Sequence, residues 1–175
     1  MIKLIRKERI LFYFLFIIAG IFCNIYLLGE ATIDNDVISV STSAKYIVLI
    51  INNIYITYLY VKSKKVKSVY DKIIIRVGTE KIFNQYIMNA IIDICFFQFI
   101  TYFIVYLKVG INLEYISLFI VFLVLNTANF FLQELISTLV FTAKKGEKYI
   151  FLPILMNLIF HYYIVPILVG KFFMR

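Results

Sequence analysis

The sequence has one histidine, two cysteines and no cluster of metal-ligating residues, and these scarcities exclude most enzyme classes. Cys23 and Cys95 sit inside apolar runs, where a thiol behaves as a small hydrophobe, so we expect neither a disulfide nor a thiolate metal site. The signatures HExxH and GxSxG and any Cys–His pairing are also missing. We therefore expect no catalytic residue, no metal and no cofactor bound by this chain.

Two further absences concern ATP and proteolysis. Gly78 and Gly146 stand alone, so the chain has no glycine-rich phosphate-binding loop. Asp93 is the only aspartate inside an apolar segment, and intramembrane proteolysis by paired aspartates needs a second one. If the protein uses ATP, we expect another chain to bind the nucleotide and its Mg²⁺.

Apolar residues, in contrast, are abundant. The 175-residue chain is 63% hydrophobic and 18% aromatic, with a mean hydropathy of +0.93, whereas a soluble domain is about half apolar. This composition predicts an all-α, polytopic membrane helical bundle forming a single domain over residues 1–175. The net charge of +8 is explained by basic cytoplasmic loops, so we expect no nucleic-acid partner.

Five segments approach the roughly 20 apolar residues that cross a bilayer. They cover about 10–28, 45–61, 84–107, 115–142 and 149–170. The first follows a basic N-terminus but is too long for a signal peptide and lacks a small-residue cleavage site, so we interpret it as an uncleaved span.

The basic residues indicate how these spans are oriented. Fourteen of the 18 lysines and arginines lie in segments 1–9, 62–84 and 143–148. Because positive charge collects on the cytoplasmic side, the N-terminus is expected in the cytoplasm and, after five spans, the C-terminus outside the cell membrane. The loop 29–44, which carries three acidic residues, fits the outer side.

The segment 62–84 is the longest interruption between apolar runs, and its charge predicts that it lies in water. Its basic residues are Lys62, Lys64, Lys65, Lys67, Lys72, Arg76 and Lys81. An apolar stripe recurs through it at helical spacing: Val66, Val69, Tyr70, Ile73, Ile74 and Val77. We expect an amphipathic cytoplasmic helix between the second and third spans, whose apolar face docks on a partner.

Polar residues inside the predicted spans are costly in lipid and are expected to face protein or water. Asp93 and Glu134 lie about 12–14 Å from the predicted cytoplasmic ends of their helices, at 1.5 Å per residue. Asn52, Asn53 and Asn157 come out at a similar depth. The sequence therefore predicts a polar layer in the inner half of the membrane.

A second polar pattern follows one face of the fourth span. Asn126, Asn129, Gln133 and Ser137 recur at i, i+3, i+7 and i+11. Two interpretations stay open: hydrogen bonds that hold helices together, or a polar conduit. His161, alone in an aromatic run, is expected to be a packed histidine rather than a ligand or proton relay.

The layout of spans and loops resembles the ABC-2 type permeases, the membrane subunits of bacterial ABC exporters. In that family a coupling helix between the second and third spans sits in a groove of the nucleotide-binding subunit. The resemblance assigns this role to residues 66–77, followed by Gly78 and Thr79. It implies an ATP-binding subunit as partner, together with a second permease subunit or a second copy of this chain.

The resemblance has one departure, since family permeases usually have six spans and five are predicted here. It implies a shortened subunit that couples ATP hydrolysis to export of a substrate such as a peptide. Abundant Ile, Lys, Asn, Tyr and Phe suggest an AT-rich, Gram-positive genome. The alternative function is a non-transporting bacteriocin-immunity or regulatory membrane protein, whose basic helix lies on anionic lipid. A small ion channel around Asp93, Glu134 and His161 is a third hypothesis.

Overall fold

The computed structural model describes residues 9–21, 45–109 and 116–173, and every regular element in these ranges is a helix. The first is the N-terminal helix, Arg9–Ile21. The predicted all-helical class is therefore confirmed for this part of the chain. The end of the first predicted span and the predicted outer loop 29–44 lie outside the described residues.

The next two helices form a long hairpin. Helix α3 runs without a break over Lys45–Val77, 33 residues, and α4 over Thr79–Val109, 31 residues. Gly78 alone separates them, with a φ of 82°, a left-handed conformation that glycine adopts without a side-chain penalty. The segment 62–84 thus consists of the end of α3, one turn residue and the start of α4.

The remaining elements form a second antiparallel pair. Helix α5 covers Ile116–Thr142 and is followed by a return arm of four consecutive elements. These are the 3₁₀-helix η2 (Gly146–Ile150), α6 (Phe151–Ile159), the π-helix η3 (Phe160–Ile164) and α7 (Val165–Phe173). The π turn ends two residues before Pro166, which has no N–H to donate, and such local adjustments accommodate proline within a helix.

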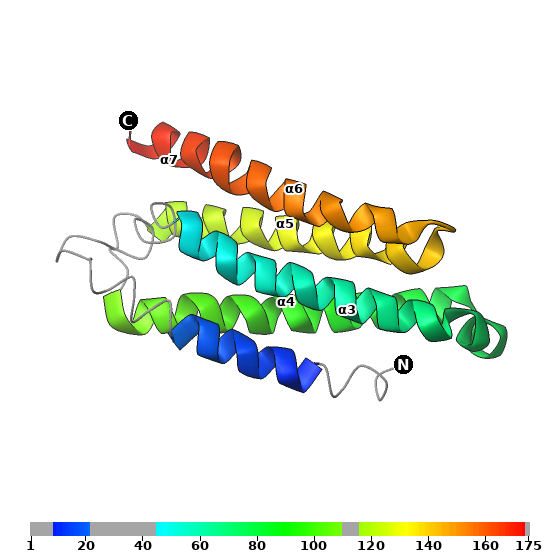
Figure 1. The fold of residues 1–175 in the computed structure, drawn as a ribbon. Helices are drawn as coiled ribbons and strands as arrows, with labels where there is room; N and C mark the ends of the chain where they lie inside the picture. Colours follow the sequence, from blue (N-terminus) through cyan, green and yellow to red (C-terminus); the bar gives the residue numbers. More distant parts are fainter. Residues whose placement is uncertain (1–8, 22–44, 110–115, 174–175) are drawn as a thin grey trace.

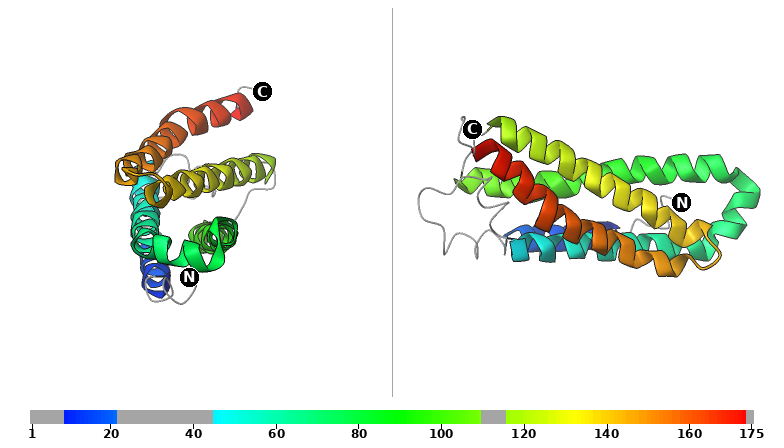
Figure 2. Two further views of the ribbon diagram at one scale, coloured as in Figure 1. Left: turned by 90° about the vertical axis from the view of Figure 1, so that its right-hand side faces the viewer. Right: turned by 90° about the horizontal axis from the view of Figure 1, so that it is seen from above.

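The turn of each hairpin lies at the same end of the bundle. Figure 1 shows the α3–α4 and α5–η2 turns together at one end and the C-terminal helix α7 running to the other. In the right-hand view of Figure 2 the α3–α4 hairpin reaches beyond the α5–η2 turn. The basic segments 62–84 and 143–148 therefore lie toward the same end of the bundle. This arrangement is the one expected if both segments face the same side of a membrane.

Aromatic side chains hold the bundle together around α3. The largest core cluster joins four helices through Phe12, Phe16, Ile51, Tyr55, Tyr58, Leu59, Ile94, Phe97 and Phe130. The ring of Tyr55 lies 4.8 Å from that of Phe97 and 4.9 Å from that of Phe130. This aromatic packing fixes the N-terminal helix, α3, α4 and α5 relative to one another.

Three described helices are long and apolar enough to cross a membrane: Thr79–Phe103, Ile116–Thr142 and Lys148–Lys171. They correspond to the third, fourth and fifth predicted spans. The N-terminal helix is shorter within the described residues, and α3 combines its apolar first half with a strongly basic second half. Five crossings therefore stay a prediction.

Candidate functional site: a buried ion network

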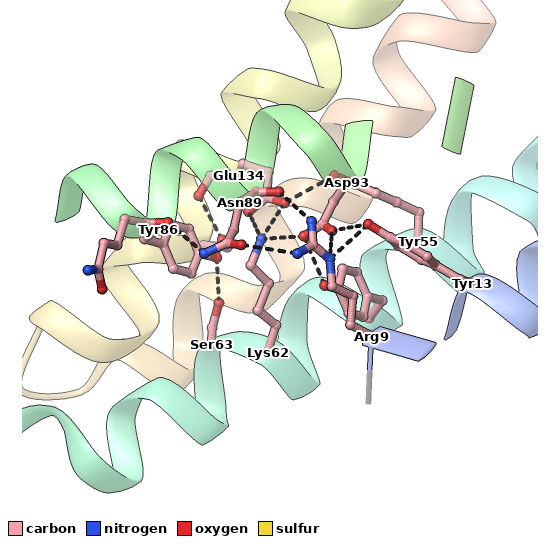
Figure 3. Close-up of polar contacts among 12 residues, drawn as sticks. Arg9, Tyr13, Tyr55, Lys62, Ser63, Tyr86, Asn89, Asp93 and Glu134 are labelled. Carbon is pink, nitrogen blue, oxygen red and sulfur yellow. Dashed lines mark hydrogen bonds and ion pairs between the residues drawn. The ribbon is translucent and has the colours of Figure 1, made fainter. Parts of the chain in front are cut away.

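Lys62 is the centre of the candidate site. Although it begins the most basic stretch of the sequence, its side chain is buried, with 1% of the residue exposed. Its Nζ lies 3.0 Å from Asp93 Oδ2 and 2.9 and 3.1 Å from the two carboxylate oxygens of Glu134. Figure 3 shows Lys62 pointing from α3 toward both acids. The prediction that all of 62–84 lies in water is wrong at this residue.

Arg9 approaches the same site from the N-terminal helix. Its Nε donates to Asp93 Oδ1 at 2.7 Å, and its Nη1 donates to Asn89 Oδ1 at 3.1 Å. Planar guanidinium groups suit such two-point recognition. Arg9 therefore attaches the N-terminal helix to α4 rather than only setting the topology.

Tyrosine hydroxyls supply the remaining donors to the two carboxylates. Tyr13 donates to Asp93 Oδ1 at 2.7 Å, and Tyr58 donates to Asp93 Oδ2 at 2.9 Å. Tyr55 donates to Glu134 Oε1 at 3.0 Å. Each oxygen of Asp93 thus accepts hydrogen bonds from one cation and one phenol, which satisfies a carboxylate removed from water.

The network is electrically neutral, because two cations face two anions. A buried charge is tolerated when it is paired and fully hydrogen-bonded, and the same requirement holds in a bilayer. The Lys62 ammonium also lies 4.5 Å from the ring centroid of Tyr86. We therefore name Arg9, Lys62, Asp93 and Glu134 the ion network.

A chain of hydroxyls lies beside Lys62. Ser137 Oγ donates to the backbone oxygen of Glu134 at 2.7 Å, so its only hydrogen is used there. The hydroxyl of Tyr86, 2.6 Å away, must then donate to Ser137 and accept from Ser63 at 3.1 Å. This chain joins α3, α4 and α5 next to the ion network.

A second polar cluster lies further along the helices. Asn52 Nδ2 donates to Asn157 Oδ1 at 3.0 Å and to His161 Nε2 at 2.7 Å. Because an amide nitrogen only donates, Nε2 of His161 is the accepting nitrogen of a neutral ring. Asn126 Nδ2 donates to the Tyr102 hydroxyl at 2.8 Å. We name these five residues the amide layer, and His161 is packed in it as the sequence predicts.

The predicted single polar layer is therefore divided in two. Asp93 and Glu134 belong to the ion network, whereas Asn52 and Asn157 belong to the amide layer. Asn52 precedes Lys62 by ten residues of α3, about 15 Å at 1.5 Å per residue. The depth count failed because it ended the second helix at 61 and began the third at 84, while both continue nearly to Gly78. Asn53 belongs to neither group, since it is exposed.

The predicted docking stripe is also placed differently. Val66 is buried with Tyr86 and Phe141, and Tyr70 packs against this cluster. Val69, Ile73 and Ile74 are half-buried, while Val77 is 39% exposed. Most of the stripe therefore faces the bundle itself, because α3 continues as a packed helix instead of lying apart. The apolar residues exposed at the hairpin tip are Ile75, Val77 and Phe83.

The sequence held a signal for Lys62 that the basic run concealed. The buried residues Ile51, Tyr55, Tyr58, Leu59, Lys62 and Val66 share one face of α3. A lysine on such a face must find an anion. Arg9 and the tyrosine donors had no comparable signal, since their roles depend on contacts between helices distant in sequence.

Within the described ranges, no group of three His, Cys, Asp or Glu side chains has the arrangement of a metal site. Comparisons with protein-family models, curated protein sequences and solved structures give no match to this chain.

Proposed function

We propose that this chain is a membrane subunit of an ABC-type exporter, in which a separate ATP-binding subunit acts on the tip of the α3–α4 hairpin. The proposal rests on the ion pair that connects α3 to α4. Lys62 of α3 and Asp93 of α4 form a buried ion pair between the two helices of the hairpin. A displacement of the tip therefore reaches the charged centre of the bundle.

A groove of about 700 Å³ beside the tip supports this role. It begins at Val77, Gly78 and Thr79 and extends along α4 to Asn89 and Ile92. Asn89 accepts from Arg9, and Arg9 donates to Asp93. A protein bound in the groove would thus lie one hydrogen bond from the ion network.

In the proposed mechanism, ATP-driven closure of the partner tilts α3 and α4 and changes the exposure of the ion network. ATP and Mg²⁺ bind to that partner. We place the basic end of the bundle in the cytoplasm, with five crossings, and assign a substrate such as a peptide. A second permease subunit or a second copy of this chain completes the transport path.

The test uses the exposed apolar residues of the tip. The double variant Ile75→Asp and Phe83→Asp places charge on the proposed contact surface without touching a buried side chain. We expect it to lose the ATP-binding subunit when the intact complex is purified from native membranes and its components are identified by mass spectrometry. Ser68→Asp, at an exposed site two turns before the tip, is the matched control. Retention of the ATP-binding subunit by the double variant would refute the docking surface.

A second candidate function is a regulatory or immunity protein whose tip binds anionic lipid. The observation in its favour is that Ile75, 86% exposed, lies beside Arg76 and one turn from Lys72, a combination that suits an anionic membrane surface. The full-length protein, held in neutral nanodiscs, would then bind anionic vesicles but not neutral ones, and this binding would weaken with salt. The transport proposal expects no such binding.

A further inference from the structure

The polar stripe of α5 contains buried amides that lack a complete set of partners. Asn126, Asn129 and Gln133 are 1%, 6% and 0% exposed. Among the described residues, no hydrogen-bond partner exists for Asn126 Oδ1, Asn129 Nδ2 or either terminal atom of Gln133. Asn157 Nδ2 on α6 is also unpartnered. Helix-to-helix hydrogen bonds therefore explain only part of this stripe.

The position of Asn129 and Gln133 on α5 follows from helical geometry. Spacings of seven, four and seven residues place four residues on one face of α5: Phe122, Asn129, Gln133 and Val140. At one end of this face, the ring of Phe122 lies 6.4 Å from that of Phe160. Beyond this contact, α5 also packs against the 3₁₀-helix η2 and against α6. The return arm therefore packs along α5, and the bundle's own helices bury Asn129 and Gln133, which are 6% and 0% exposed.

The same register places Asn126 and Asn157 on the same side of the contact between Phe122 and Phe160. Asn126 is four residues beyond Phe122, about 6 Å, and Asn157 is three residues before Phe160, about 4.5 Å. Because α5 and α6 are antiparallel, both steps lead toward the same end of the bundle (Figure 1). The unpaired atom of Asn126 is an acceptor and that of Asn157 is a donor, so one small molecule that both donates and accepts satisfies both.

The chemistry of the unpaired atoms identifies this molecule. Buried polar atoms without partners carry their full desolvation penalty, and no bilayer water relieves it. A lipid or protein partner does not reach side chains that the bundle's own helices bury. The unpaired set combines acceptors and donors, which matches water, with two hydrogens to donate and two lone pairs.

We propose that α5 and the return arm enclose a file of bound water molecules along Asn126, Asn129 and Gln133. The file begins at the amide layer, bridging Asn126 and Asn157. It ends one helical turn beyond Gln133, at Ser137, whose hydroxyl joins the chain to Tyr86 and Ser63. The water file thus extends from the amide layer to the neighbourhood of Lys62. It follows the face of α5 next to Phe130, which packs with Tyr55 and Phe97. The proposal is independent of whether an ATP-binding partner exists.

The first test observes water at Gln133 directly. The chain has three glutamines, Gln85, Gln98 and Gln133, so the full-length protein labelled with ¹⁵N-glutamine gives three side-chain amide signals. Gln133→Met identifies the signal of Gln133. We expect a cross-relaxation peak between this amide and water, with the sign of a long-lived bound molecule, although the residue is fully buried. A Gln133 amide with no water peak would overturn the proposal.

The second test uses thermal stability and separates a wet stripe from a dry one. If water connects these amides, Gln133→Met leaves its neighbours without partners, and the melting temperature in mild detergent should fall by about 2–4 °C. In a dry stripe the same change removes a buried unpaired amide, so stability should rise. Gln85→Met, on the partly exposed surface of α4, is the control. An unchanged or raised melting temperature for Gln133→Met contradicts the proposal.

Discussion

The ion network and the amide layer share the helices α3, α4 and α5, yet their polar groups are satisfied in different ways. In the ion network, the ammonium of Lys62 contacts both carboxylates, and each oxygen of Asp93 accepts two hydrogen bonds. In the amide layer, Asn126 and Asn157 each keep an unpaired atom. A buried charge therefore needs a counter-charge from the protein itself, whereas a small molecule can complete the hydrogen bonds of a neutral amide.

The backbone is regular around the ion network and less regular around the amide layer. The ion network lies on the regular helices α3, α4 and α5 and on the N-terminal helix. The amide layer includes His161, inside the π-helix η3, next to the proline-containing start of α7. Regular helices hold charges in a fixed geometry, while the wider π turn accompanies the less completely paired region.

The largest expected effect comes from breaking the ion network at its most shared member. Asp93→Asn removes the anion that Arg9 and Lys62 both contact and leaves an excess of buried positive charge. We expect a loss of about 3–5 kcal/mol in unfolding free energy, measured by denaturant titration in mild detergent. Asp71→Asn, at an exposed position of α3, should change it by less than about 0.5 kcal/mol. A similar small effect for both variants would show that the network does not stabilise the fold.

The pairing of Lys62 with Glu134 is tested by a double-mutant cycle. Lys62→Met and Glu134→Gln should each destabilise the protein. The first leaves Glu134 without its cation, and the second leaves Arg9 and Lys62 facing the single anion Asp93. The double variant should lose less than the sum of the two single losses, with a coupling of about 1–3 kcal/mol. Strictly additive losses, measured by the same titration, would contradict a direct ion pair.

The smallest expected effect distinguishes two adjacent asparagines in α3. Asn52→Ala removes the donor to Asn157 and His161, and should cost about 1–3 kcal/mol because buried polar atoms lose their partner. Asn53→Ala changes an exposed residue and should stay within about 0.5 kcal/mol. Equal losses for the two variants in thermal unfolding would contradict the assignment of Asn52 to the amide layer.

Helix type and the identity of the expensive polar residues could be predicted from the sequence. Apolar runs predicted the helices α4 and α5, and the cost of ionisable groups in lipid singled out Asp93 and Glu134. The partner of these acids was missed because Lys62 opens a run of basic residues and was counted with them. Lys62 is buried because it lies on the buried face of α3, three residues beyond Leu59 and four before Val66.

The linear order of residues determined that this protein is helical, strongly apolar and basic in a few short segments, because composition and local spacing act along the chain. Contacts between helices, in contrast, bury Lys62 and attach the N-terminal helix to α4 through Arg9. They also divide the expected polar layer into two groups. These outcomes depend on which helices meet and at what level. That choice follows from packing Tyr55, Phe97 and Phe130 together and from the left-handed turn at Gly78, which sets the register of α3 against α4.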